Sequence, residues 1–188
     1  MIRLAVLAAV VLLGASGCGS DSPHGGGVLV TGAGRIGSLQ IDVSDWDAIV
    51  AFAGEPDTQL TTRGWPGLPL YHALGYGCDH KGPTLDSPSG NTVTTFLGCE
   101  TTYFVNAATD RLVAFQTYSA DFRTSNGIRP GTAQSTADRL EHQTPRGPWN
   151  AIGETSRGAY LILPSMTGNV FSLMLESRHH PIGLTFTE

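Results

Sequence analysis

The feature that most restricts the fold of this chain is a short helix followed by a strand–turn–strand segment. Ser44 is a good helix N-cap, and residues 46–53 carry the apolar stripe of a helix, which Gly54 ends. Farther along, residues 102–105 and 111–118 are strand-like segments on either side of a turn, which predicts an antiparallel hairpin. A helix that precedes paired antiparallel strands favours an α+β fold.

The second half of the chain repeats this order. Residues 133–142 predict a helix with Thr132 as its N-cap, and residues 160–163 and 170–175 predict a second hairpin. Residues 182–187 add a predicted edge strand. Aligning the two N-caps preserves two core positions, which pair Ile49 with Ala137 and Phe52 with Leu140.

This repeat predicts two tandem units, residues 28–121 and residues 122–188, each with one helix packed on a small antiparallel sheet. The charged fraction is only 14%, and Gly and Thr are plentiful, which favours strands and turns over long helices. The fold is therefore expected to be α+β and rich in strands. Gly- and Pro-rich sequence connects the predicted elements between residues 61 and 90 and includes one strand-like stretch, Leu70–Cys78.

The helix-then-hairpin unit resembles two groups of bacterial proteins. The turn of the first predicted hairpin carries Thr109-Asp110-Arg111. The segments that carry the resemblance are residues 36–54 and 103–115 in the first half of the chain, and residues 127–140 and 160–175 in the second half. The unit is similar to that of the secreted beta-lactamase inhibitory proteins and of small outer-membrane-assembly-type lipoproteins. The inhibitory proteins carry two such units, each with a disulfide, whereas here only the first half has a cysteine pair. The resemblance implies the tandem fold and assigns no contact residue or partner.

The N-terminal segment indicates export. A short positive start precedes the apolar run at residues 4–13, which is too short for a membrane span and is typical of a signal peptide. The small residues before Cys18 resemble the lipobox of bacterial lipoproteins, which implies a signal peptide at residues 1–17 and lipidation of Cys18. An ordinary secretory cleavage site is the alternative. Residues 18–27 are small and flexible, as expected of a tether.

The chain has three cysteines, an odd number. If Cys18 carries lipid, Cys78 and Cys99 remain, and a cysteine pair in an exported protein usually forms a disulfide. A metal site is the alternative, but it needs more soft ligands than the neighbouring Asp79 and His80 supply. We therefore predict a disulfide.

A glycine pattern near the tether matches the G-x-G-x-x-G spacing of dinucleotide-binding proteins. The fingerprint must open a helix, because the helix N-terminus binds the pyrophosphate. Here Gly37 is followed by residues that alternate like a strand, Leu39, Ile41 and Val43, and the predicted helix begins only after them. The pattern therefore predicts no nucleotide cofactor, and it marks the end of the tether.

Other chemical motifs are weak. The net charge is −5 with no basic run, so a nucleic-acid partner is not expected. His179 and His180 lack a third metal ligand at a recognisable spacing and are interpreted as a polar strand end. Cys78 beside Asp79 and His80 is not a nucleophile if it is oxidised. The sequence thus predicts no catalytic, cofactor-binding or metal-binding residue.

Four aromatic residues lie in Gly- and Pro-rich sequence and are candidate partner-binding anchors, Trp65, Tyr71, Tyr76 and Trp149. The alternative is that they cap the core between sheet and helix. The sequence favours a lipid-anchored, non-catalytic protein-binding domain on the extracytoplasmic side of the membrane, with an unidentified envelope or secreted protein as partner. A secreted form is the alternative location. An inhibitor of a secreted or envelope enzyme and a small exported hydrolase with a loop-built site are the alternative functions.

Overall fold

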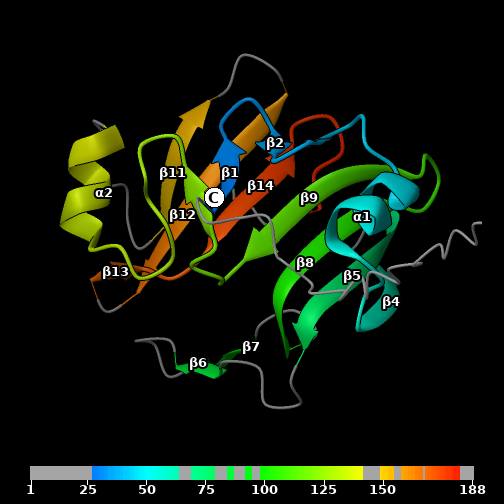
Figure 1. Ribbon diagram of the computed structural model, residues 1–188, viewed down its shortest axis with the longest axis horizontal. Helices are drawn as coiled ribbons and strands as arrows, with labels where there is room; N and C mark the ends of the chain where they lie inside the picture. Colours follow the sequence, from blue (N-terminus) through cyan, green and yellow to red (C-terminus); the bar gives the residue numbers. More distant parts are fainter. Residues whose placement is uncertain are drawn as a thin grey trace, which may run out of the picture.

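The computed structural model describes residues 27–63, 69–78, 84–86, 92–94, 98–141, 149–154, 158–166 and 168–182. Within them the fold is α+β and strand-rich, as predicted, with two helices and mostly antiparallel sheets (Figure 1). The helices are α1 (Trp46–Ala53) and α2 (Gln134–Glu141). Neither described helix has the length and apolar composition needed to cross a membrane.

The main sheet is antiparallel and contains strands from both halves of the chain. Its strands are, in sheet order, β11 (Trp149–Glu154), β12 (Ala159–Met166), β14 (Leu173–Ser177), β9 (Arg111–Thr117), β8 (Cys99–Asn106), β5 (Leu70–Cys78) and β4 (Thr58–Arg63). β13 (Asn169–Val170) pairs with β12 beside this path. The two halves join where β14 pairs with β9, with Leu175 opposite Phe115.

A smaller sheet contains β10 (Phe122–Thr124), β1 (Val28–Thr31), β2 (Arg35–Ile36) and β3 (Leu39–Gln40), in that order. β1 pairs with β10 in parallel, so the first strand of one predicted unit adjoins the first strand of the other. A separate hairpin is formed by β6 (Thr84–Asp86) and β7 (Thr92–Thr94). The two predicted units are therefore in contact through both the main and the smaller sheet.

The principal core lies on one face of the main sheet, which we call the helix-side face. Because side chains alternate along a strand, Leu74, Tyr103 and Phe115 point to this face together with Leu175. In Figure 1, α1 lies over β5 and β8, whereas β1 and β2 lie over β12 and β14. α2 lies at the β13 edge and contributes the buried Ala137.

The predicted start of the first helix is wrong by one residue. Asp45, not Ser44, is the N-cap: its Oδ1 accepts a hydrogen bond from the amide of Ala48 at 3.0 Å. The Ser44 hydroxyl instead accepts from the amide of Gln40 at 2.9 Å. Ser44 is therefore used in the turn before the helix, and the next polar residue caps it. Gly54 ends the helix as predicted.

The strand predicted from the alternation up to Val43 is shorter than expected. β3 ends at Gln40, and residues 41–43 form a turn in which Asp42 has a left-handed φ of 62°. Leu39 and Ile41 are buried, but Val43 is 61% exposed. The alternating residues do not all belong to the strand, because the chain turns at residues 41–43 before it enters α1.

The second helix also differs from its prediction. Thr132 does not cap it: the Thr132 hydroxyl accepts from the amide of Arg129, and the amide of Gln134 donates to the carbonyl of Gly168. Of the aligned core positions, Ala137 is buried like Ile49, whereas Leu140 is 38% exposed. The helix occupies the sheet edge, where only part of its predicted apolar face meets the core.

The first predicted hairpin is confirmed, since β8 pairs with β9 around the turn at residues 107–110. β12 also pairs with β14, but the strand predicted over residues 170–175 is divided: β13 ends at Val170 and β14 begins at Leu173. β5 has its predicted bounds. The glycine pattern forms a tight turn between β1 and β2 and does not open a helix. Residues 183–187 of the predicted edge strand lie outside the described residues, and Ile182 is not in a strand.

Candidate functional site

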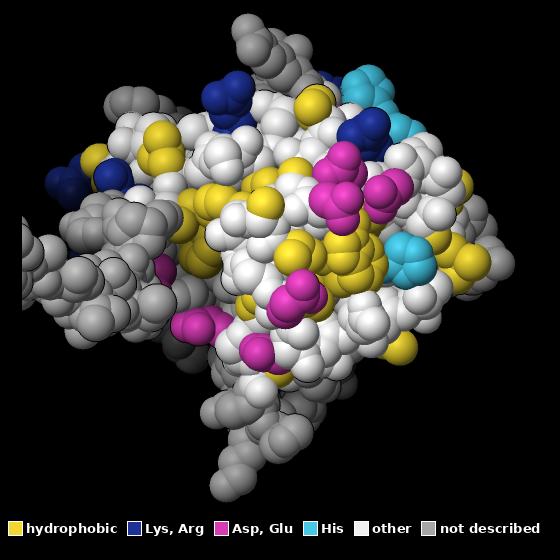
Figure 2. Space-filling view, turned by 45° about the vertical axis from the view of Figure 1, so that its right-hand side comes forward, with side chains coloured by type: hydrophobic (Ala, Val, Ile, Leu, Met, Phe, Trp, Pro, Cys, Tyr) yellow, Lys and Arg dark blue, Asp and Glu magenta, His cyan; other side chains and the backbone are white. Residues whose placement is uncertain are grey.

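A groove of about 430 Å³ lies at the end of the main sheet where β5 and β8 meet the C-terminus of α1. Its walls come from five places in the chain: the start of β1, the end of α1, the end of β5, the first half of β8, and the segment that leads into β10. We call it the acidic groove, because apolar side chains line it and carboxylates border it. Figure 2 shows acidic side chains around apolar ones on this face.

Aromatic rings form the apolar part of the groove. Tyr103 is 1% exposed, and its ring centroid lies 5.5 Å from that of Tyr76 in an edge-to-face arrangement. Phe52 of α1 and Phe122 of β10 complete the aromatic lining. Gly37 permits this packing, because a Cβ there would lie 2.8 Å from Cε2 of Phe52.

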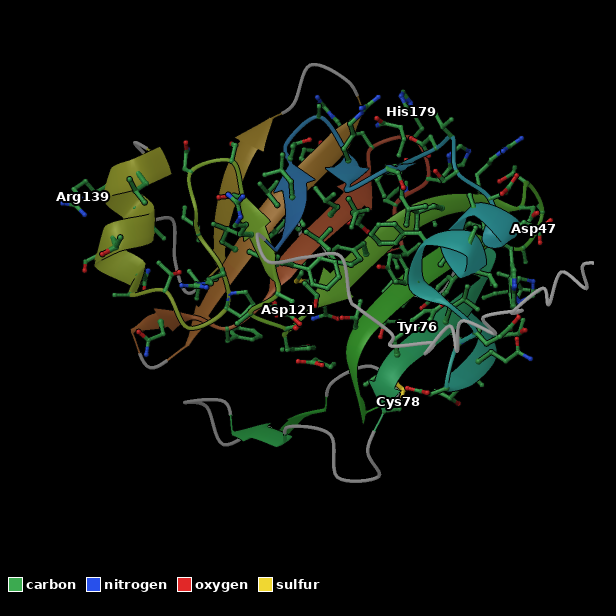
Figure 3. All side chains as sticks on the ribbon, viewed as in Figure 1. Asp47, Tyr76, Cys78, Asp121, Arg139 and His179 are labelled. Atoms are coloured by element: carbon green, nitrogen blue, oxygen red, sulfur yellow. A yellow bond between two sulfur atoms is a disulfide. The ribbon has the colours of Figure 1, made fainter. Side chains whose placement is uncertain are left out.

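The carboxylates of the groove are Glu100, at the start of β8, and Asp121, before β10. Both are exposed, and neither forms an ion pair within the part of the chain that the structure describes. Figure 3 shows Asp121 and Tyr76 lying apart across this end of the molecule. No Lys, Arg or His among the described residues lines the groove. The part of its border that the structure describes is therefore negatively charged.

The electrostatics of the tyrosines reflect this setting. Burial, and secondarily the charges of Glu55 and Asp57, raise the pKa of Tyr76 to about 12. The Tyr76 hydroxyl donates a hydrogen bond to the carbonyl of Gly54 at 3.1 Å. Burial also raises the pKa of Tyr103. Both phenols therefore remain neutral at physiological pH.

The predicted disulfide is confirmed and lies next to the groove in sequence. Cys78 of β5 is bonded to Cys99 of β8, and the two residues are directly opposite in the strand register. Gly75 lies against the bond: a Cβ there would overlap Sγ of Cys99 and lie 2.9 Å from Sγ of Cys78. The groove residues Gly77 and Glu100 each adjoin one of the cysteines. The disulfide thus fixes the spacing of two groove walls.

Comparison with family models, with curated proteins and with solved structures finds no match for this chain. Its function must therefore be argued from its own residues.

The four aromatic candidates are not all in one place. Tyr76 lines the acidic groove. Tyr71 lies on the opposite face of the sheet, where it is 5% exposed and packs edge-to-face on Phe104 at 5.6 Å. Trp65 and Cys18 lie outside the described residues, and so does the Trp149 side chain, although its backbone belongs to β11. Of the two candidates whose side chains the structure describes, Tyr76 lines the groove and Tyr71 does not.

The histidine pair forms a polar cluster after β14, near the turn that holds Asp42. His180 Nδ1 lies 3.2 Å from Asp42 Oδ1, and the Ser177 hydroxyl donates to the Asp42 carboxylate at 2.8 Å. The amides of His179 and His180 both donate to the Ser177 oxygen. The two histidines thus lie after the end of β14 and are not its last residues, as the sequence had suggested. The Asp42 carboxylate, and not a histidine, accepts the hydrogen bond of the Ser177 hydroxyl, so the cluster lacks the serine–histidine hydrogen bond of a histidine-activated nucleophile.

No metal centre is formed by the described residues, since no three His, Cys, Asp or Glu side chains come close enough to hold an ion. A second hollow of about 410 Å³ is lined by Trp46, Gln59, Leu60, Thr61 and His72. Its His72 ring is bonded to the Thr61 hydroxyl at 2.8 Å. No carboxylate of the residues that the structure describes lines this hollow, so the acidic groove is the better candidate for selective recognition.

Sequence reasoning missed most of the groove. Glu100, Tyr103, Asp121 and Phe122 come from separate elements, and each looks like ordinary strand or loop sequence. One signal in the sequence pointed to a groove residue: Glu100 directly follows Cys99, and a residue beside a disulfide is held in place.

Proposed function

We propose that this protein is an exported, lipid-anchored, non-catalytic binding protein that captures a partner protein in the acidic groove. The observation that carries the proposal is the groove itself, in which one buried and three partly buried aromatic rings are bordered by carboxylates without ion-pair partners in the described structure. Aromatic side chains in a concave site supply contact area, and polar groups at its border supply specificity.

The proposed lipid anchor would hold the groove close to the membrane. Val28 lines the groove and begins β1, and it stands ten positions after Cys18 in the chain. A fully extended segment of that length reaches about 35 Å. The groove would therefore face partners that lie in, or next to, the same membrane. The disulfide supports export, because such bonds persist in oxidising compartments.

The tandem organisation is part of the proposal. The β8–β9 and β12–β14 pairs each follow a helix in the chain, and this order supports the resemblance to tandem inhibitory and envelope proteins. Inhibition of an envelope enzyme would be a narrower form of the same binding function, with the enzyme as the captured protein.

Site-specific photo-crosslinking in cells tests the proposal. A benzophenone amino acid replaces Ala53, an exposed residue of the groove, in the full-length protein. The matched control places it at Ala108, an exposed residue in the turn at the other end of β8. We expect a discrete protein adduct from position 53 only, because only that position faces the groove.

Three results of the crosslinking experiment would contradict the proposal. Adducts of equal yield from both positions would indicate general surface contact, and an adduct from position 108 alone would place the interface elsewhere. Absence of any adduct from position 53, with the protein present at normal abundance, would mean that the groove does not bind a protein.

A further inference from the structure

We propose that the occupant of the acidic groove is the cationic side chain of an arginine or lysine in the partner protein, flanked by apolar residues. This inference rests on the proposed binding function and adds the chemistry of the ligand. Three features of the groove carry it: carboxylates without an ion-pair partner in the described part of the chain, a tyrosine hydroxyl that can accept a hydrogen bond, and the aromatic rings beside them.

The carboxylates define the charge of the ligand. Glu100 and Asp121 have no ion-pair partner in the described part of the chain, and Glu55 and Asp57 follow α1 close to Tyr76. The helix adds to this field, because its C-terminal carbonyls carry partial negative charge. A cation entering the groove therefore gains attraction without displacing a cation of the described residues, whereas an anion is repelled.

The hydroxyl of Tyr103 offers a hydrogen-bond acceptor to such a ligand. The side chain is 1% exposed and lines the groove, and its hydroxyl makes no hydrogen bond to another described residue. Because burial keeps this phenol neutral, its oxygen can accept a hydrogen bond from a guanidinium or ammonium N–H.

The aromatic rings suit the rest of such a side chain. Tyr76 and Tyr103 present rings beside the carboxylates, and a cation near the face of a ring is attracted by the ring quadrupole. Phe52 and Phe122 offer apolar contact for the methylene stem and for flanking residues. The volume of about 430 Å³ leaves room for more than one side chain.

Titration calorimetry of the full-length protein in detergent micelles tests the inference. The probes are three capped tripeptides that differ only in the central residue: Leu-Arg-Leu, Leu-Lys-Leu and Leu-citrulline-Leu. Citrulline has the shape of arginine without its charge. We expect the arginine and lysine peptides to bind and the citrulline peptide to bind at least about tenfold more weakly, because a hydrogen bond to a charged group is lost. Added salt should weaken only the charged peptides.

Variants assign the effect to the groove. The Glu100→Gln/Asp121→Asn protein should bind the arginine peptide at least about tenfold more weakly. Asp110→Asn, in the exposed turn at the far end of β8, removes a charge without touching the groove and should leave binding unchanged. Tyr103→Phe should weaken binding about fivefold, while its thermal unfolding should show no loss of stability, since no hydrogen bond within the described structure is removed.

The possible results distinguish failure of the cationic-ligand inference from failure of the proposed protein-binding function. Equal affinity for the arginine and citrulline peptides, or no effect of the double variant, overturns the cationic ligand. If neither charged peptide binds while the Ala53 adduct forms, the groove binds a protein by other chemistry and this inference is wrong. If the Ala53 adduct fails to form, the proposed protein-binding function fails, and peptide binding alone would then indicate a small cationic ligand.

Discussion

Replacing both Cys78 and Cys99 by alanine is expected to lower the free energy of unfolding by about 3 kcal/mol. The disulfide closes a loop with a sequence separation of 21 residues, and its loss gives that loop back its freedom in the unfolded chain. Urea unfolding followed by circular dichroism measures the change. Reduced wild-type protein should unfold at the same urea concentration as the double variant.

A further substitution shows whether the bond is packed as the structure has it. Gly75→Ala places a methyl group against Sγ of both cysteines, so it should destabilise the oxidised protein more than it destabilises the cysteine-free variant. Equal costs in the two backgrounds would contradict the packing of Gly75 on the disulfide. A loss below about 1 kcal/mol in the double variant would contradict the stabilising role of the bond.

Phe115→Ala is expected to cost about 3–5 kcal/mol of unfolding free energy. Phe115 is fully buried and pairs with Leu175 where the two halves of the main sheet join. Its ring lies 5.1 Å from that of Tyr103, in the groove, and 5.2 Å from that of Phe122, in the smaller sheet. Truncation therefore opens a cavity at the centre of the fold.

The control for Phe115→Ala is Leu140→Ala on α2, where 38% of the side chain is exposed. This variant should lose much less stability, because less apolar area leaves water when Leu140 folds. Urea unfolding of both variants provides the comparison. A smaller loss for Phe115→Ala than for Leu140→Ala would contradict the placement of the core between the two sheets.

Local sequence patterns predicted the elements that depend on local chemistry. β5 has its predicted bounds, and β8 pairs with β9 and β12 with β14, because strand-like segments flank turn residues in each case. The disulfide followed from export and from elimination of Cys18. Gly54 ends α1 because it adopts a positive φ of 86°.

The sequence-based predictions were wrong where contacts between residues far apart in the chain determine the structure. At Ser44 the hydroxyl is taken by the Gln40 amide, so Asp45 caps α1 instead. At α2 the first amide is bonded to Gly168, a residue from another turn, which no local N-cap rule includes. The pairing of β9 with β14 and of β1 with β10 joins residues far apart in the chain, and strand periodicity alone does not specify such partners.

The candidate site was predictable only in part. Tyr76 was identified as an anchor because it lies in Gly-rich sequence, and it does line the groove. Tyr71, chosen on the same ground, is buried on the opposite face, because residues an odd number apart on a strand point to opposite faces. Glu100 and Asp121 are 21 positions apart on separate elements, so only the folded sheet brings them to one border.

The most direct test of the central claim is competition at the groove. Membranes that carry the full-length protein with the crosslinker at position 53 are irradiated with the Leu-Arg-Leu peptide or with its citrulline counterpart. If the native partner inserts a cationic side chain into the acidic groove, the arginine peptide will suppress the adduct and the citrulline peptide will not. An adduct that persists undiminished at saturating arginine peptide would show that partner and peptide do not share the groove, and would contradict the account.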